Sequence, residues 1–259
     1  MKLTVLGGSA ASVGPGQGCS GYLIEGGDTR IVLDLGPGTL PELRRHTDYR
    51  TMDGIVISHM HLDHVLDLLA LRFAVAYNPV PAPLPIPLWL PPDGSTVLQR
   101  AGAAFSTSDT GGDFFTPMFA ISEYDPDASL TIGDLTVTFA RTVHPLPCWA
   151  MRIASASQPG QDLVYTADTG PAVKLETFSM GCAVVLSEAT LPITRDDPDE
   201  SRIHLKGKDA GEIAAKSGAQ TLVLTHMFEE NDPVDTQVRA AEVFSGPIHR
   251  AVPGLAIEW

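Results

Sequence analysis

Short apolar or β-branched runs recur along the sequence, and several are followed within a few residues by a histidine or an aspartate. Runs of this length and composition predict buried β-strands. The polar side chain that follows is then expected where the strand leaves its sheet. Residues 1–8 similarly predict a first strand and turn. The four runs with the residues that follow them are 55–57 with His59, 135–139 with His144, 163–167 with Asp168, and 221–225 with His226.

Helical periodicity alternates with these strands. Residues 206–217 predict a helix with Ala210, Ile213 and Ala214 facing inward, and Gly218 is a typical stop signal. Strands in the first half and strand–helix alternation in both halves predict an α/β fold. In such a fold two sheets pack face to face and the helices lie outside them.

A second helix is predicted near the end of the chain. Asp232 and Pro233 form a typical helix start, because aspartate caps free backbone N–H groups and proline suits the first turn. Val234, Val238 and Ala241 then fall on one stripe of the helix.

Residues 78–92 include seven prolines in fifteen positions. Because proline cannot donate to a β-ladder, residues 84–90 are expected to form an edge strand or an extended wall. A rigid connection onto an edge strand is favoured over a segment that lines a substrate site. Residues 65–76, just before it, are apolar on nearly every helical face. A helix of this kind must be covered all round, so we expect a second subunit and a homodimer.

The chemistry concentrates after the apolar run 55–57, where His59, His61, Asp63 and His64 lie within six residues. Imidazole and carboxylate groups are common ligands of zinc and related divalent ions. In an extended turn His59 and His61 point one way, while Asp63 and His64 enter a helix and can reach a neighbouring position. A solvated polar turn with incidental histidines is a weak alternative for three histidines in six residues. The segment predicts a metal site that can serve two ions.

The pattern His-x-His-x-Asp-His is similar to the signature of the metallo-β-lactamase superfamily. The resemblance implies a four-layer αββα sandwich, with residues 1–259 as a single hydrolase domain. It also implies two divalent metal ions, with zinc expected and manganese or iron as alternatives. The implied ligands are His59, His61 and His144 for the first ion, Asp63, His64 and His226 for the second, and Asp168 for both.

Residues 31–36 match an early strand of the same superfamily that carries an aspartate, here Asp34. The resemblance implies that Asp34 orients the histidines of residues 59–64 by hydrogen bonding, because a metal-bound imidazole needs a partner on its other nitrogen. A plain turn residue is the alternative.

Residues 187–190 (Ser-Glu-Ala-Thr) and 203–206 (Ile-His-Leu-Lys) resemble paired elements of the ribonuclease Z-like branch, whose members hydrolyse phosphodiesters. The resemblance implies that His204 contacts the scissile phosphate or protonates the leaving oxygen, and that Glu188 orients His204. A helix cap or surface histidine is the alternative. The expected reaction is attack by hydroxide held between the two ions, with His204 as general acid and Asp63 accepting a proton.

The sequence departs from tRNA-processing ribonuclease Z. His144 and Asp168 are only 24 positions apart, which leaves room for a hairpin and none for a tRNA-binding arm. Ser187 stands where the usual loop has histidine. A closer similarity is to bacterial atypical cyclic nucleotide phosphodiesterases, so a 3′,5′-cyclic nucleotide such as cyclic AMP is the expected substrate. The segments that carry this similarity are 18–23, 63–68, 204–211 and 224–227.

Charge also argues against a nucleic-acid partner. Seventeen Lys and Arg against thirty-one Asp and Glu give a net charge of −14, and no basic stretch is longer than Arg44-Arg45. The remaining alternatives are a tRNA 3′-end processing endonuclease, a lactonase or thioesterase on the same metals, and a non-catalytic metal or ligand binder.

The composition is typical of a cytoplasmic enzyme. No apolar stretch approaches the ~20 residues of a membrane span, and the N-terminal apolar part is too short for a signal peptide. Cys19, Cys148 and Cys182 are widely spaced, which suits a reducing compartment. We expect all three to be small buried hydrophobic residues.

Overall fold

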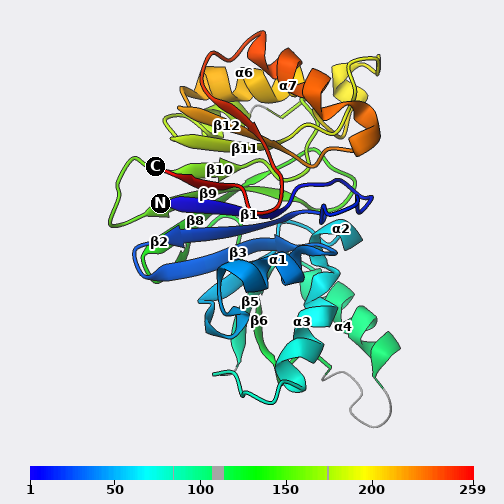
Figure 1. Cartoon of the computed structure of the whole chain (residues 1–259), viewed down its shortest axis with the longest axis vertical. Helices are drawn as coiled ribbons and strands as arrows, with labels where there is room; N and C mark the ends of the chain where they lie inside the picture. Colours follow the sequence, from blue (N-terminus) through cyan, green and yellow to red (C-terminus); the bar gives the residue numbers. More distant parts are fainter. Residues whose placement is uncertain (84, 107–113, 174) are drawn as a thin grey trace.

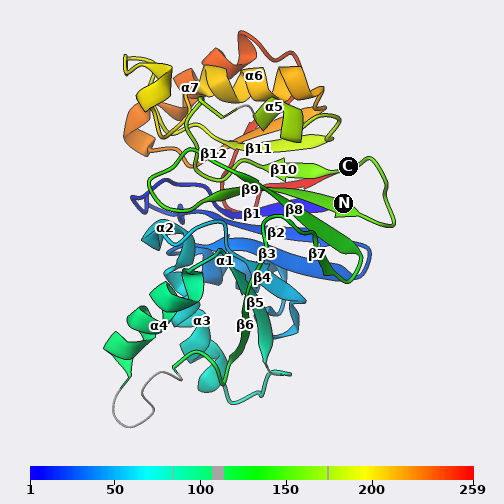
Figure 2. The ribbon, with the colours of Figure 1, turned by 180° about the vertical axis from the view of Figure 1, so that it is seen from behind.

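The computed structural model describes residues 1–83, 85–106, 114–173 and 175–259. Within these residues the strands form two seven-stranded sheets, and helices cover the outer face of each (Figures 1 and 2). The order helix, sheet, sheet, helix confirms the predicted four-layer α/β sandwich. The helices are α1 (Thr39–His46), α2 (Leu62–Val65), α3 (Asp67–Ala76), α4 (Gly94–Phe105), α5 (Leu175–Phe178), α6 (Gly207–Ser217) and α7 (Pro233–Ala241).

The first sheet comes mainly from the first half of the chain, and helices α1 to α4 cover its outer face. Its first four strands in spatial order are antiparallel and the remaining strands continue in parallel. In spatial order they are β14 (Ala256–Glu258), β1 (Lys2–Gly7), β2 (Gly21–Gly26), β3 (Thr29–Leu35), β4 (Gly54–Val56), β5 (Ile86–Leu90) and β6 (Phe119–Glu123).

The second sheet comes from the second half and is covered by α6 and α7 (Figure 1). Its antiparallel part leads into a parallel part at β10. In spatial order its strands are β13 (Ile248–Arg250), β12 (Thr221–Thr225), β11 (Val184–Glu188), β10 (Leu163–Tyr165), β9 (Trp149–Ser155), β8 (Leu135–Arg141) and β7 (Leu130–Ile132).

Three apolar clusters hold the layers together. In β2, Tyr22 and Ile24 face the second sheet, while Leu23 faces the helices of its own side. In β12, Val223 faces the first sheet, while Leu224 packs in the cluster that includes α6. This alternation follows from the two-residue period of a strand. Because each such strand is buried on both faces, it reads in the sequence as a continuous apolar run.

The predicted helix at residues 206–217 is confirmed as α6. Ala210, Ile213 and Ala214 are buried, and Gly218 ends the helix in a left-handed conformation with φ 73°. Glycine adopts this conformation without the steric cost that a Cβ atom brings.

The predicted last helix is confirmed as α7, but its stripe of Val234, Val238 and Ala241 is not the buried face. Asp232 does cap α7, since its side chain accepts from the N–H groups of Val234 and Asp235. Val234 and Val238, however, are 56% and 53% exposed, and the buried face carries Thr236 and Ala240.

The reason is that α7 packs against two glycines of α6. A Cβ atom at Gly207 would lie 2.2 Å from the carbonyl oxygen of Thr236, and one at Gly211 would lie 2.6 Å from that of Ala240. The two helices therefore approach through small residues, and this contact decides which face of α7 turns inward.

The prediction of an edge strand at residues 84–90 is also wrong, apart from Leu84, which lies outside the described residues. The strand β5 lies between β4 and β6 and pairs with both. Pro87 is tolerated because the paired register with β4 begins one residue later, at Leu88. Phe119 opens the outer strand β6, opposite Ile86.

The apolar segment 65–76 forms the end of α2 and the whole of α3. Leu68, Leu71 and Val75 are buried, whereas Phe73 is 47% exposed and Tyr77, just past the helix, is 71% exposed.

Among the described helices, none combines the length and hydropathy that a membrane span requires.

The three cysteines are buried and free, as predicted. Burial raises the pKa of the Cys19 thiol to about 12, followed in effect by the nearby charge of Asp63. Burial likewise raises the pKa of Cys182 to about 11. Thiols of this kind stay protonated and unreactive.

Candidate metal centre

The ligand-type side chains meet at one end of the two sheets because each follows a strand that ends there. His59 and His61 follow β4, and Asp63 and His64 lie in α2 directly after them. His144, Asp168 and His226 follow β8, β10 and β12 of the other sheet. The site is therefore assembled from both halves of the chain.

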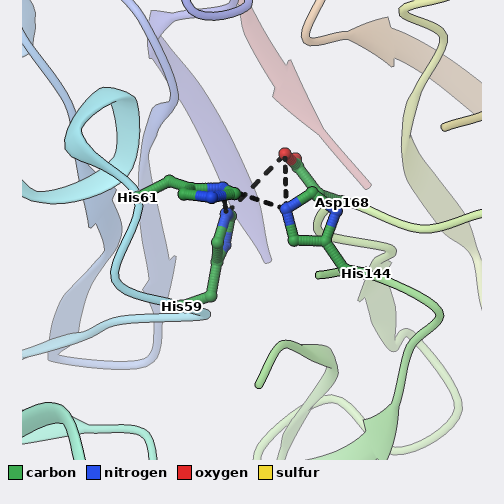
Figure 3. A group of neighbouring side chains, drawn as sticks. All are labelled: His59, His61, His144 and Asp168. Carbon is green, nitrogen blue, oxygen red and sulfur yellow. Dashed lines mark hydrogen bonds and ion pairs between the residues drawn. The ribbon is translucent and has the colours of Figure 1, made fainter. Parts of the chain in front are cut away.

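His59, His61, His144 and Asp168 form the first group, and their side chains converge on one point (Figure 3). His61 Nδ1 lies 3.0 Å from His59 Nε2 and 2.9 Å from His144 Nε2. Two nitrogen ligands of one tetrahedral zinc ion lie about 3.3 Å apart, given zinc–nitrogen distances near 2.0 Å. The nitrogen atoms thus lie at nearly the separation that a shared cation imposes.

Asp63, His64 and His226 form the second group. His226 Nε2 lies 3.1 Å from Asp63 Oδ2, and His64 Nε2 lies 3.6 Å from the same oxygen. The structure therefore brings together every member of both predicted groups.

Asp168 lies between the two groups. Its Oδ2 lies 3.7 Å from His59 Nε2 and 3.4 Å from His226 Nε2, while its Oδ1 lies 3.4 Å from His64 Nε2. Burial favours the neutral acid, but the charges of His226 and His64 hold the pKa of Asp168 well below its usual range. A carboxylate in this position can contact cations on both sides.

Unsatisfied buried atoms test whether the site suits metal. Among the described residues, His64 Nε2 and Asp168 Oδ1 are buried and have no hydrogen-bond partner. Buried polar atoms without partners are costly, so each needs an explanation. Both atoms point into the cluster, and a divalent cation would satisfy both. The cluster is therefore suited to divalent metal.

Asp34 holds the predicted metal-binding segment through hydrogen bonds to Ser58 and His64. It is fully buried, and its Oδ2 lies 2.8 Å from His64 Nδ1. The same carboxylate accepts from the backbone N–H and the hydroxyl of Ser58, each at 2.7 Å, and from the Tyr165 hydroxyl at 2.8 Å. These bonds leave His64 Nε2 free to face the cluster, which is the arrangement expected of a metal-binding imidazole.

Two hydroxyl groups that the sequence analysis missed hold other histidines. Ser58 Oγ lies 3.0 Å from His59 Nδ1, and Thr190 Oγ1 lies 2.7 Å from His226 Nδ1. Adjacency to His59 and to Glu188 was the only available signal, because serine and threonine are frequent at strand ends for many reasons.

The backbone is strained at three positions of the site. Asp34, Ala167 and His226 have φ values of 55°, 49° and 53°, in the left-handed region that non-glycine residues rarely adopt. Asp34 is bonded to His64, Ala167 directly precedes Asp168, and His226 is itself a member of the second group. Such strain costs about 1–3 kcal/mol per residue and persists only where the surrounding structure fixes it.

Glu188 and His204 form a pair beside the cluster. His204 Nδ1 lies 3.0 Å from Glu188 Oε1, and the His204 ring stacks on that of His226 at a centroid distance of 5.5 Å. Glu188 is fully buried and also accepts from the N–H of Thr169 at 2.6 Å and of Leu205 at 3.2 Å. The side chain of His204 is 18% exposed, and because Nδ1 is bonded to Glu188, Nε2 is the ring nitrogen left for an incoming molecule.

This environment sets the charge of His204. Burial opposes the charged form, but the charge of Glu188 and its hydrogen bond outweigh burial and raise the pKa of His204 to about 9. His204 is therefore protonated near neutral pH.

The Asp63 carboxylate is in the opposite situation. Burial raises its pKa, but the hydrogen bond and charge of His226 and the charge of His64 outweigh burial and hold the pKa at about 2. Such a carboxylate is a better metal ligand than proton acceptor.

Comparison with known proteins places the chain in a family. The family described as Beta-lactamase superfamily domain matches residues 29–227. The chain belongs to the beta-lactamase superfamily. With this family and this cluster, the chain is a metal-dependent hydrolase, as the sequence predicts.

Individual relatives in the superfamily cover the whole chain. Uncharacterized protein ML1173 of Mycobacterium leprae is 34% identical over 98% of this chain and 87% of its own length. The Probable metallo-hydrolase YhfI of Bacillus subtilis is 30% identical with full coverage of both chains. The crystal structure of YhfI superposes with a TM-score of 0.85 at 28% identity, over 100% of this chain and 98% of that one. A Ribonuclease Z of Myxococcus xanthus is 24% identical over 100% of this chain and 97% of its own length.

Proposed function

We propose that the chain is a phosphodiesterase that hydrolyses a small phosphodiester, with a 3′,5′-cyclic nucleotide such as cyclic AMP as its substrate. The observation that carries the proposal is the His204–Glu188 pair at the edge of the metal cluster. Thioester cleavage has less need of a proton donor held at this place, because a thiolate is far less basic than the alkoxide that a phosphodiester releases.

We propose two divalent ions, with zinc first among the candidates. His59, His61 and His144 would hold one, Asp63, His64 and His226 the other, and Asp168 would contact both. When bound, the ions supply Lewis acidity, which neutralises phosphate charge and lowers the pKa of water.

The protein's own contribution is to hold a proton at the leaving oxygen. Glu188 occupies Nδ1 of His204, so the ring has a fixed orientation with Nε2 as its free nitrogen. Its positive charge attracts the phosphate as well as the developing alkoxide. His204 would thus serve as general acid, with Glu188 as the residue that orients it.

A small substrate is favoured over RNA by two features. The segment between His144 and Asp168 is β9, a turn and β10 in antiparallel pairing, which is the predicted hairpin and contains no arm. The net charge of −14 opposes a polyanion, whose binding depends on clustered cations. The name of the Ribonuclease Z relative keeps tRNA 3′-end processing as the second candidate.

One activity panel tests the proposal. Zinc-loaded and manganese-loaded protein would be assayed with cyclic AMP, cyclic GMP, bis(p-nitrophenyl) phosphate, a pre-tRNA and a lactone. We expect hydrolysis of the cyclic nucleotides and of bis(p-nitrophenyl) phosphate. Cleavage of pre-tRNA or the lactone, with cyclic nucleotides intact, would refute the proposed substrate.

We further propose a homodimer and a cytoplasmic location. The dimer is supported by a patch of exposed apolar side chains on and near α3 and α4. Phe73, Tyr77 and Phe105 are 47%, 71% and 56% exposed, and the rings of Phe73 and Phe105 both contact that of Phe114.

A further inference from the structure

The loop that carries His204 is exposed for most of its length. Residues 193–196 and 198–201 are exposed, and this stretch includes Asp196, Asp199 and Glu200. At Arg202 the chain turns inward, and two residues later His204 reaches the cluster. Something at Arg202 must therefore hold the loop against the protein.

Arg202 is buried through its guanidinium group, with its side chain 3% exposed. Nη1 donates to Asp209 Oδ2 at 2.6 Å, and Nη2 donates to Asp199 Oδ1 at 2.6 Å. Asp209 is 22% exposed and Asp199 is 72% exposed. Water solvates the second partner well, so the pair with Asp209 is the stronger contact.

Asp209 connects this ion pair to α6. It lies in the first turn of the helix, and its Oδ2 also accepts from the N–H of Lys206 at 2.8 Å. One carboxylate therefore fixes the chain on both sides of His204. The preceding segment is tied through Arg202 and the following one through Lys206.

Gly170 fixes the same segment from the opposite side. A Cβ atom at Gly170 would lie 1.8 Å from the carbonyl oxygen of Arg202, so the two backbones touch. Gly170 is two residues from Asp168, and its N–H donates to the carbonyl of Val143 at 2.9 Å. The backbone of Arg202 thus rests on the segments that carry Asp168 and His144.

We propose that Arg202 is a positioning residue for His204: its ion pair with Asp209 holds residues 202–206 against Gly170 and so sets where the His204 ring meets the substrate. This inference rests on the proposed function, in which His204 is the proton donor. Arg202 itself does not touch substrate. Its guanidinium is suited to this task because it bridges two carboxylates with a rigid fork, which lysine cannot reproduce.

The test compares three variants of the full-length, metal-loaded protein. Arg202→Ala should lower kcat for cyclic AMP by about 10–100-fold, since a displacement near 1 Å can cost 10²-fold. Hydrolysis of bis(p-nitrophenyl) phosphate, whose leaving group needs little acid assistance, should change by less than about 3-fold. Arg202→Lys should recover part of the loss. The matched control is Arg152→Ala, which also removes a partly buried, ion-paired arginine, but one whose partner Asp162 precedes β10, at the end of the strand opposite Asp168.

Hydrogen exchange gives a readout that needs no substrate. Arg202→Ala should speed amide exchange in residues 202–206, where the N–H of Leu205 is held by Glu188, while the strands stay protected. Unchanged exchange, equal loss on both substrates, or no loss on cyclic AMP would each overturn the inference. A wild-type protein without cyclic nucleotide activity would refute the proposed function, and faster exchange in the variant would still support the anchor.

Discussion

Replacing His204 by alanine is the sharpest test of how the site works. The charge of Glu188 raises the pKa of His204 to about 9, so the ring carries its proton at pH 7. His204→Ala should therefore remove the proton donor from essentially every molecule. General acid catalysis contributes about 10²–10⁴-fold, or about 2.7–5.5 kcal/mol of barrier. That loss should appear in the hydrolysis of cyclic AMP, whose leaving ribose oxygen is strongly basic.

The same variant should lose much less on bis(p-nitrophenyl) phosphate, because p-nitrophenolate leaves without a proton. Initial rates with both substrates and metal content per chain would be measured at one pH. Metal content should stay at the wild-type level, since each of the two predicted ligand groups is complete without His204. The control is His249→Ala, which removes a histidine of β13 that belongs to neither group.

Two outcomes would refute this reasoning. Equal losses on both substrates would mean that His204 binds phosphate and does not donate a proton. No loss on either substrate would leave His204 as a structural partner of Glu188 only, and the proposed phosphodiesterase would lose its main support.

Three further predictions concern charge, metal and assembly. In Glu188→Gln the pKa of His204 should fall, because the charge of Glu188 that raises it is gone. The alkaline limb of the kcat/KM profile should therefore move to lower pH. An unmoved limb would contradict the role of His204 as general acid. Zinc at 100 times its dissociation constant should stabilise chelator-treated protein by about 2.7 kcal/mol for each ion bound, a rise in melting temperature of about 5–10 °C per ion for a chain of this size. Asp168→Ala should abolish most of the rise and most of the activity, and a full rise in that variant would remove Asp168 from the metal site. Light scattering should report a dimer at micromolar concentration and a monomer for Phe73→Asp, whereas a wild-type monomer would refute the dimer.

The positions of the ligands could be predicted because each follows shortly after an apolar run that predicts a buried strand. The run at residues 221–225 coincides with β12, so the sequence correctly predicts that His226 follows a strand. The partners of the histidines could not be found in this way. Tyr165 reaches Asp34 across 131 residues, and only the packing of the two sheets brings them together.

The edge position of β5 was predicted wrongly and the buried face of α7 was not identified, for similar reasons. The prolines of β5 suggested an edge, yet the strand that covers it, β6, follows only after α4 and residues outside the described part. The valines of α7 do lie on one stripe, yet Gly207 and Gly211 of α6 select the face with Thr236 and Ala240 for burial. In both cases a partner remote in sequence decides the outcome, and local pattern carries no information about it.

The return of β14 to pair with β1 gives the topology a circular character. If β14 led directly into β1, the first sheet would run β14, β1, β2, β3, β4, β5, β6 and the second β13 to β7, each with spatial neighbours that are also successive in the chain. A circular permutant opened in the exposed turn at Asp127, between β6 and β7, would therefore build each sheet from one uninterrupted segment. Its strand pairings would be shorter in range than those of the natural order, which favours faster folding. The metal ligands would still meet, because each keeps the strand that positions it.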